Sequence, residues 1–112
     1  MIDLVRAETR GCDLCVEHAD LASTDFTALL GDERVVFAGN LPYQVTSPVL
    51  FGLLPALRDA RAAGAVLMVQ AEVARRMTAA AGGRDYGVLS VLLQAELDVE
   101  RVARVKPGCF LP

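Results

Sequence analysis

Five consecutive residues place an amide, a rigid turn and an aromatic ring together: Gly39-Asn40-Leu41-Pro42-Tyr43. They follow the apolar run 35–38, which has the composition of a buried strand. The stretch therefore falls where a strand should end, and ligands of open α/β sheets bind at that edge. This position makes the five residues candidates for a site.

The residue types suit methylation of the amino group of an adenine. That nitrogen is a poor nucleophile because its lone pair is delocalised into the ring, and two acceptors that take both N–H groups free the lone pair. The side-chain oxygen of Asn40 and the carbonyl of Leu41 are candidate acceptors, and Pro42 biases Leu41 towards an extended backbone. Tyr43 offers a face on which a flipped base can stack. With a sulfonium methyl as electrophile, alignment is the main task, and neither a metal nor a strong base is required.

A second interpretation of the same residues is purely structural. Asn-Leu-Pro-Tyr could form a turn from a strand into a helix, with Asn40 satisfying the backbone. The four residues alone favour that interpretation, so the neighbouring sequence has to decide.

The 112 residues are 54% hydrophobic and 22% charged, which is typical of one globular domain. Apolar runs are far shorter than the ~20 residues that span a bilayer, and no signal peptide is visible, so we expect a cytoplasmic protein without membrane contact. The net charge of −3 is uneven, because residues 1–40 carry −5 and residues 41–112 carry +2. A modestly basic second part could face phosphates, although ordinary solvated arginines explain it more simply.

The three cysteines indicate no disulfide framework. Cys12-x-x-Cys15-x-x-His18 looks like a metal spacing. On a strand over residues 13–18, however, Cys12 and His18 would point away from Cys15, and no fourth ligand is evident. We therefore expect no metal site.

Hydrophobic periodicity predicts alternating helices and strands. The runs at 34–39 and 65–70 are nearly continuous, which is typical of parallel strands buried on both faces. Ser47 is a good N-cap for the intervening helix, and Pro55 should kink or split it. The order indicates an α/β three-layer fold, with a mostly parallel sheet flanked by helices. Helices are expected at 2–10, 48–57, 71–80 and 88–94, strands at 13–18, 34–39, 65–70 and 97–105, and a short helical turn at 26–30.

From about residue 17 onwards, the chain resembles the ribosomal RNA adenine dimethyltransferases, to which the erythromycin-resistance methyltransferases are related. The Met68-Val69-Gln70 and Tyr86-Gly87-Val88-Leu89-Ser90 blocks are the most specific matches besides the Asn-Leu-Pro-Tyr motif. The matching segments are 18–21, 25–26, 39–43, 46–50, 68–76, 85–91 and 110–112.

The resemblance implies a partial Rossmann-like methyltransferase fold, S-adenosylmethionine as donor, and two adjacent adenines of small-subunit ribosomal RNA as substrates, each dimethylated. It assigns Asp20 to the amino group of the donor's adenine, and Asn40 to both the donor and the target nitrogen. The Leu41 carbonyl would meet the target, Tyr43 would stack on it, and Pro42 belongs to the same catalytic motif. Phe110 resembles an aromatic residue near the target base. The alternatives are that Asp20 caps the following turn, which is the less favoured of its two roles, and that Phe110 belongs to the core, which is about as favoured as its role in the site.

The chain also departs from the family. No Gly-rich turn follows a strand, no acidic residue is evident for the donor's ribose, and Gln44 stands where the family usually has Asn. We therefore expect residues 1–112 to form a single partial catalytic domain with impaired donor binding. An unpaired strand edge at 13–18 should favour self-association. The alternative is a noncatalytic RNA-binding or ribosome-assembly module that kept the face for the target base.

Overall fold

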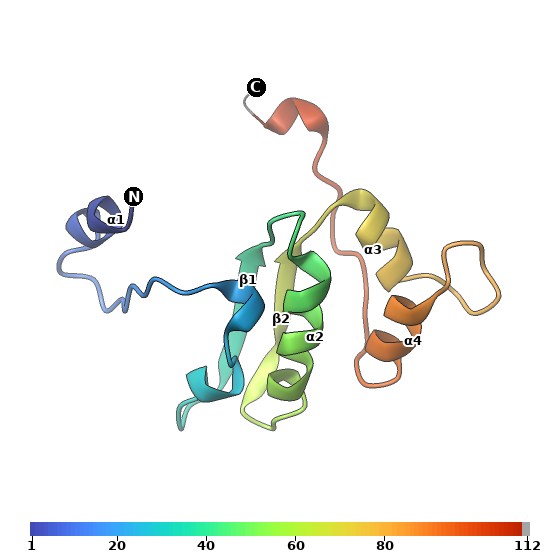
Figure 1. The fold of residues 1–112 in the computed structure, drawn as a ribbon, viewed down its shortest axis with the longest axis horizontal. Helices are drawn as coiled ribbons and strands as arrows, with labels where there is room; N and C mark the ends of the chain where they lie inside the picture. The colour runs from blue at the N-terminus through green and yellow to red at the C-terminus, as the bar shows by residue number, and fades with distance from the viewer. Residues whose placement is uncertain (111–112) are drawn as a thin grey trace.

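A parallel two-stranded sheet forms the centre of the molecule in the computed structural model, which describes residues 1–110. The strands are β1 (Val35–Asn40) and β2 (Ala62–Met68), and the helix α2 (Thr46–Leu57) connects them. Parallel strands need such a crossover. Asn40 lies opposite Met68, so the carboxyl ends of both strands meet at one edge of the sheet (Figure 1). The predicted α/β class with a parallel sheet and flanking helices is confirmed.

The hydrophobic core lies between the sheet and α2. Helix α2 buries Val49, Leu50 and Leu53 against the sheet, at the spacing of one helical face. Phe26 completes this core, and its ring and that of Phe37 lie nearly perpendicular with centroids 6.2 Å apart. This apolar layer between the sheet and α2 therefore fixes the position of the end of β1 relative to the beginning of α2.

The other face of the sheet is open, so the prediction that both strands are buried on two faces is wrong. Residues of β1 alternate between half-buried and exposed. Val36 is 61% exposed and Val66 is 63% exposed. The physical reason is that α2 covers one face only, and alternate side chains of a strand point to the other.

Helix α2 is continuous over Thr46–Leu57, so Pro55 does not split it. The N-cap is Val45 rather than the predicted Ser47. Pro48 lies in the first turn, where a backbone N–H would have no acceptor within the helix, so proline costs no helical hydrogen bond there. Pro55 lies close to the other end, where few turns remain to be disrupted.

The segment before the sheet is mostly irregular. Helix α1 (Ile2–Glu8) has no buried residue and stands apart from the sheet (Figure 1). The strand predicted at 13–18 is absent, because no other strand among the described residues pairs with it; the carbonyl of Val16 instead accepts a hydrogen bond from the Arg6 guanidinium at 3.1 Å. Two single 3-10 turns follow, η1 (Leu21–Ser23) and η2 (Thr27–Leu29).

Beyond β2, two short helices pack together: α3 (Ala71–Met77) and α4 (Val88–Gln94). Helix α3 ends three residues earlier than predicted, and the Gln94 side chain donates to the Met77 and Ala79 carbonyls at that end. The strand predicted at 97–105 is wrong, because it has no ladder partner and Val102 is 80% exposed. The 3-10 turn η3 (Pro107–Cys109) follows.

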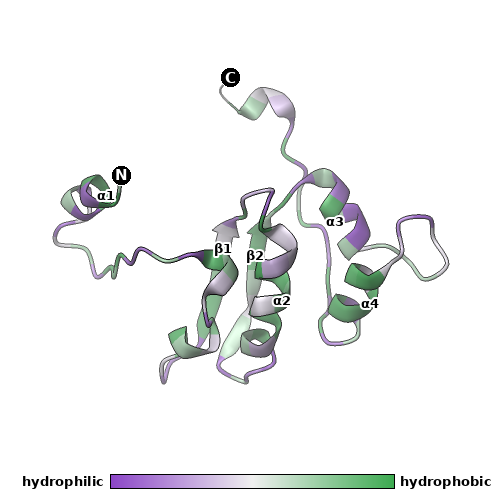
Figure 2. Ribbon diagram, in the orientation of Figure 1, coloured by the Kyte–Doolittle hydropathy of each residue, from purple (hydrophilic) through white to green (hydrophobic). Residues whose placement is uncertain are grey.

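Hydrophobic residues gather on the two strands and the faces of α2 and α4 (Figure 2). No helix within residues 1–110 combines the length and the hydrophobicity needed to cross a bilayer.

Candidate functional site

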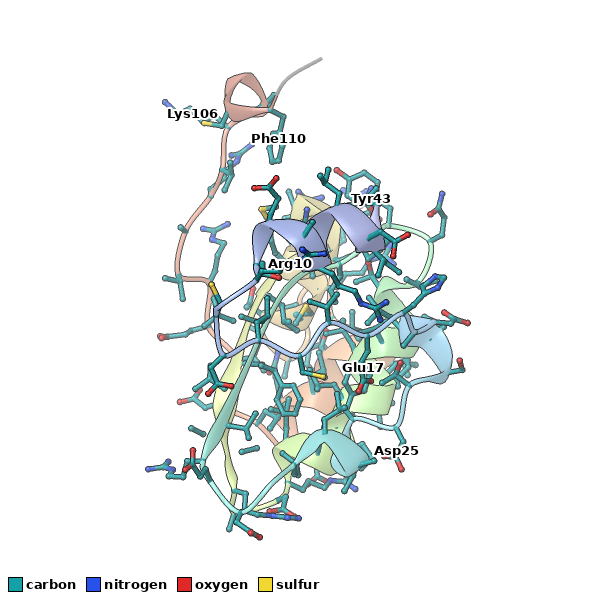
Figure 3. The ribbon with its side chains drawn as sticks, turned by 90° about the vertical axis from the view of Figure 1, so that its left-hand side faces the viewer. Arg10, Glu17, Asp25, Tyr43, Lys106 and Phe110 are labelled. Atoms are coloured by element: carbon teal, nitrogen blue, oxygen red, sulfur yellow. The ribbon has the colours of Figure 1, made fainter. Side chains whose placement is uncertain are left out.

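A groove of about 410 Å³ lies at the carboxyl edge of the sheet, where the candidate residues were expected. It brings the 40–43 stretch together with Phe110, which is distant in sequence. In Figure 3, Phe110 hangs from the C-terminal segment and its ring points towards the end of the molecule where Tyr43 lies. The groove is lined by Asn40, Leu41, Pro42, Tyr43, Gln44, Met68, Val69 and Phe110.

The end of β1 positions the two candidate hydrogen-bond acceptors. Asn40 is the last residue of the strand and its side chain is exposed. That side chain makes no hydrogen bond within the described part of the chain, so its amide is free to meet a ligand. The Leu41 N–H donates to the Met68 carbonyl at 3.0 Å, and the Leu41 side chain is only 5% exposed. The backbone that follows Asn40 is therefore fixed to both β2 and the core.

The Leu41 carbonyl and the Pro42 carbonyl differ in whether they accept hydrogen bonds. The Pro42 carbonyl accepts hydrogen bonds from the Val45 N–H at 3.2 Å and from the Thr46 hydroxyl at 2.9 Å. A carbonyl oxygen has two lone pairs, so Pro42 has no acceptor capacity left. The Leu41 carbonyl accepts no hydrogen bond from residues 1–110. Two adjacent acceptors, the amide of Asn40 and the Leu41 carbonyl, thus remain available at the groove.

Two aromatic rings of the groove are largely uncovered. Tyr43 is 68% exposed and Phe110 is 52% exposed. Because Phe110 is not buried, the interpretation of this residue as part of the core does not hold. Exposed aromatic faces beside free acceptors suit a flat, hydrogen-bonding ligand such as a nucleobase.

Asp20 does not line this groove. It is the N-cap of η1, and its carboxylate accepts a hydrogen bond from the Ala22 N–H at 3.0 Å. The structure therefore shows Asp20 as a cap of the following turn, which was one of its two expected roles.

Sequence reasoning overlooked Thr46, which is 3% exposed and bonded to the turn. A threonine four residues after Pro42, at the start of a helix, was a detectable signal, because such hydroxyls often bond the backbone of the preceding turn.

Sequence reasoning also gave no sign of a second hollow, of about 930 Å³, whose walls carry Arg75, Arg76 and Arg84.

The three cysteines are exposed and unpaired. Across residues 1–110, no three His, Cys, Asp or Glu side chains lie close enough to hold a metal ion.

Comparison with known proteins identifies similar chains. Residues 4–112 match the model of the family described as ribosomal RNA adenine dimethylase. A protein of Anaeromyxobacter sp. (strain K), named ribosomal RNA small subunit methyltransferase A, is 46% identical over 99 residues, which cover 87% of this chain and 34% of that protein. Proteins of the same name from Xanthomonas oryzae pv. oryzae (strain PXO99A) and Methylibium petroleiphilum are 44% and 42% identical, over 88% and 98% of this chain. These matches cover 37% and 43% of the two relatives, so the chain spans less than half the length of the curated relatives it matches.

Proposed function

The chain belongs to the ribosomal RNA adenine dimethylase family, and we propose that it carries the target-base half of a site that methylates adenine N6 in small-subunit ribosomal RNA. The observation that carries the proposal is the arrangement of acceptors at residues 40–42. Asn40 and the Leu41 carbonyl are free, whereas two donors occupy the Pro42 carbonyl.

These acceptors match the amino group of an adenine. One N–H would donate to the side-chain oxygen of Asn40 and the other to the Leu41 carbonyl. Held in this way, the nitrogen lone pair is turned out of the ring and towards the incoming methyl group. The Leu41 backbone is held in place, because its N–H bonds to the Met68 carbonyl and its side chain is buried. The chain would thus contribute alignment rather than acid–base chemistry.

The aromatic residues would bind the base itself. A flipped adenine must leave its stack, which costs a few kcal/mol, and stacking on protein aromatics offsets that cost. Tyr43 and Phe110 provide two exposed rings at one groove.

S-adenosylmethionine, when bound, would supply the methyl group as a sulfonium. One observation supports incomplete binding of this donor: no Gly-rich turn follows a strand in the sequence. We therefore propose that these 112 residues alone bind the donor weakly, and that the second carboxylate oxygen of Asp20, which accepts no hydrogen bond from residues 1–110, would meet the donor's adenine.

The noncatalytic alternative, an RNA-binding or ribosome-assembly module, has one observation in its favour. The groove for the base is present, whereas no Gly-rich turn for the donor follows a strand in the sequence. Such a protein would bind the same RNA without transferring a methyl group.

Transfer of labelled methyl groups to unmethylated small subunits separates these two functions. We expect slow transfer at millimolar donor, and loss of at least ~100-fold in Asn40→Ala, since oriented hydrogen bonding in the transition state typically contributes that much. A calorimetric titration of the donor should give a dissociation constant well above micromolar. No transfer at any donor concentration would favour the noncatalytic module, and undiminished transfer by Asn40→Ala would contradict the assigned role of the amide.

A further inference from the structure

The larger hollow includes Ser47 and Phe51 of α2 in its wall, close in sequence to the residues of the base groove. Gln44 lines the first hollow and Ser47 lines the second, so the two lie next to each other around the beginning of this helix. The other walls come from α3, from the loop between α3 and α4, and from the first turn of α4. Arg75, Arg76 and Arg84 give this hollow its positively charged groups.

The three guanidinium groups are available to a ligand. Arg76 pairs with Glu72 at 2.6 Å, but both side chains are more than half exposed. Arg75 reaches Asp85 only at 3.8 Å. Arg84 has no ion pair within residues 1–110. Exposed pairs of this kind contribute little to stability, so a stronger anion can displace the carboxylates.

A buried hydroxyl holds the walls of the hollow together. Ser90 is fully buried, and its hydroxyl donates to the Arg76 carbonyl while accepting from the Gly87 N–H. This contact joins the end of α3 to the loop that carries Arg84. The arginines therefore belong to one supported surface rather than to independent elements.

We infer that this hollow binds phosphates of the same RNA strand whose adenine enters the base groove. Planar guanidinium groups match phosphate oxygens in a bidentate geometry and stay charged at all physiological pH values. A base extruded into the groove leaves its flanking phosphodiesters at the groove's rim, and the start of α2 leads from that rim to the arginines. The inference rests on the proposed function, because it takes the RNA strand from there.

Salt dependence of RNA binding tests the inference without requiring methyl transfer. The probe is a fluorescent single-stranded RNA of about ten nucleotides with one central adenine, measured by anisotropy with the full 112-residue chain. Each phosphate contact on a single strand contributes roughly 0.7 to the slope of log K against log salt, which corresponds to about a fivefold loss of affinity at 0.1 M salt. We expect changes of this size for Arg75→Ala, Arg76→Ala and Arg84→Ala.

Two further variants make the result specific to this hollow. Arg34→Ala removes the same charge at the far end of β1 from Asn40, and we expect it to leave the slope unchanged. Glu72→Gln removes the carboxylate that competes for Arg76 and should tighten binding about threefold, a change opposite in sign to any loss of folding. Thermal melts of all variants verify that the fold is kept.

Equal slopes for the unmodified chain and the three arginine variants would overturn the inference, as would failure of the unmodified chain to bind RNA at low salt. If the arginine variants reduce the slope but replacing the central adenine changes nothing, the phosphate site stands and the proposed base site is wrong.

Discussion

The hydroxyl of Thr46 donates a hydrogen bond to the carbonyl of Pro42 at 2.9 Å, and Thr46 is 3% exposed. Together with the Val45 N–H, it occupies both lone pairs of the Pro42 carbonyl, whereas the Leu41 carbonyl, next to Asn40, accepts no hydrogen bond from residues 1–110. A residue outside the groove thus determines which backbone acceptor faces it.

Thr46→Val should loosen this turn without opening a cavity, because valine has nearly the same shape. We expect a loss of stability of about 1 kcal/mol, because the Pro42 carbonyl loses the hydrogen bond from a hydroxyl whose own residue is buried. Binding of adenine-containing RNA should weaken, while Thr46→Ser, which keeps the hydroxyl, should behave almost like the unmodified chain. Urea titrations and anisotropy measure the two effects. Identical behaviour of the valine and serine variants would remove the hydroxyl from this role.

Leu41→Ala should be strongly destabilising. The side chain is 5% exposed and belongs to the core, so truncation leaves a cavity and costs about 2–5 kcal/mol. For a chain of this size such a loss is a large part of the total stability. The matched control is Leu4→Ala, at a residue that is 63% exposed, which should change the midpoint of thermal unfolding very little. Equal midpoints for both variants would contradict the burial of Leu41.

The pair Asp59–Arg61 should make stability depend on pH. Side-chain and backbone hydrogen bonds from Arg61 hold the pKa of Asp59 far below its ordinary value of 3.8. Arg61 also donates to the Gly31 carbonyl at 3.2 Å, which ties the end of η2 to the start of β2. A carboxyl whose pKa is lower in the folded than in the unfolded state stabilises fully above the unfolded pKa and progressively less as the pH falls towards the folded one.

Asp59→Asn should therefore be less stable than the unmodified chain at pH 7. The difference should persist down to about pH 4.5 and shrink as the pH is lowered below 3.8. Urea unfolding at several pH values measures this difference. A gap that is constant from pH 7 to pH 2.5 would show that the charge of Asp59 contributes nothing.

The open face of the sheet should promote self-association. Val36 and Val66 expose most of their apolar surface there, and the described sheet has only two strands, so both its edges are unpaired. We expect concentration-dependent sedimentation, and a shift towards monomer in the double variant Val36→Lys and Val66→Lys. Val102→Lys, at a residue that is 80% exposed outside the sheet, is the control. A monodisperse monomer for the unmodified chain would contradict this prediction.

The sequence predicted those elements whose signals are local. Continuous apolar runs located β1 to within one residue and overlapped β2, which begins three residues earlier than predicted, and the leucine stripe located α2. These residues carry their own packing partners within one βαβ unit. The Asn-Leu-Pro-Tyr stretch was placed correctly for the same reason, since the end of a strand is visible in the sequence.

The errors concern features that depend on distant partners. Residues 13–18 and 97–105 alternate like strands, but a strand exists only where another backbone completes its ladder, and periodicity does not reveal that. Burial of β1 on one face rather than two depends on which helices cover the sheet. The hydrogen bond of Thr46 was missed because Ser47, its neighbour, fits the general rule for a helix cap equally well.

The central claim, that Asn40 and the Leu41 carbonyl accept both N–H groups of a target adenine, is tested most directly by removing those N–H groups. Two otherwise identical single-stranded RNAs, one with a central adenine and one with unsubstituted purine, are compared by anisotropy. Two hydrogen bonds of about 0.7 kcal/mol each predict roughly tenfold tighter binding of adenine, and Asn40→Ala should reduce this ratio to about threefold. Equal affinity of the unmodified chain for both RNAs would contradict the claim.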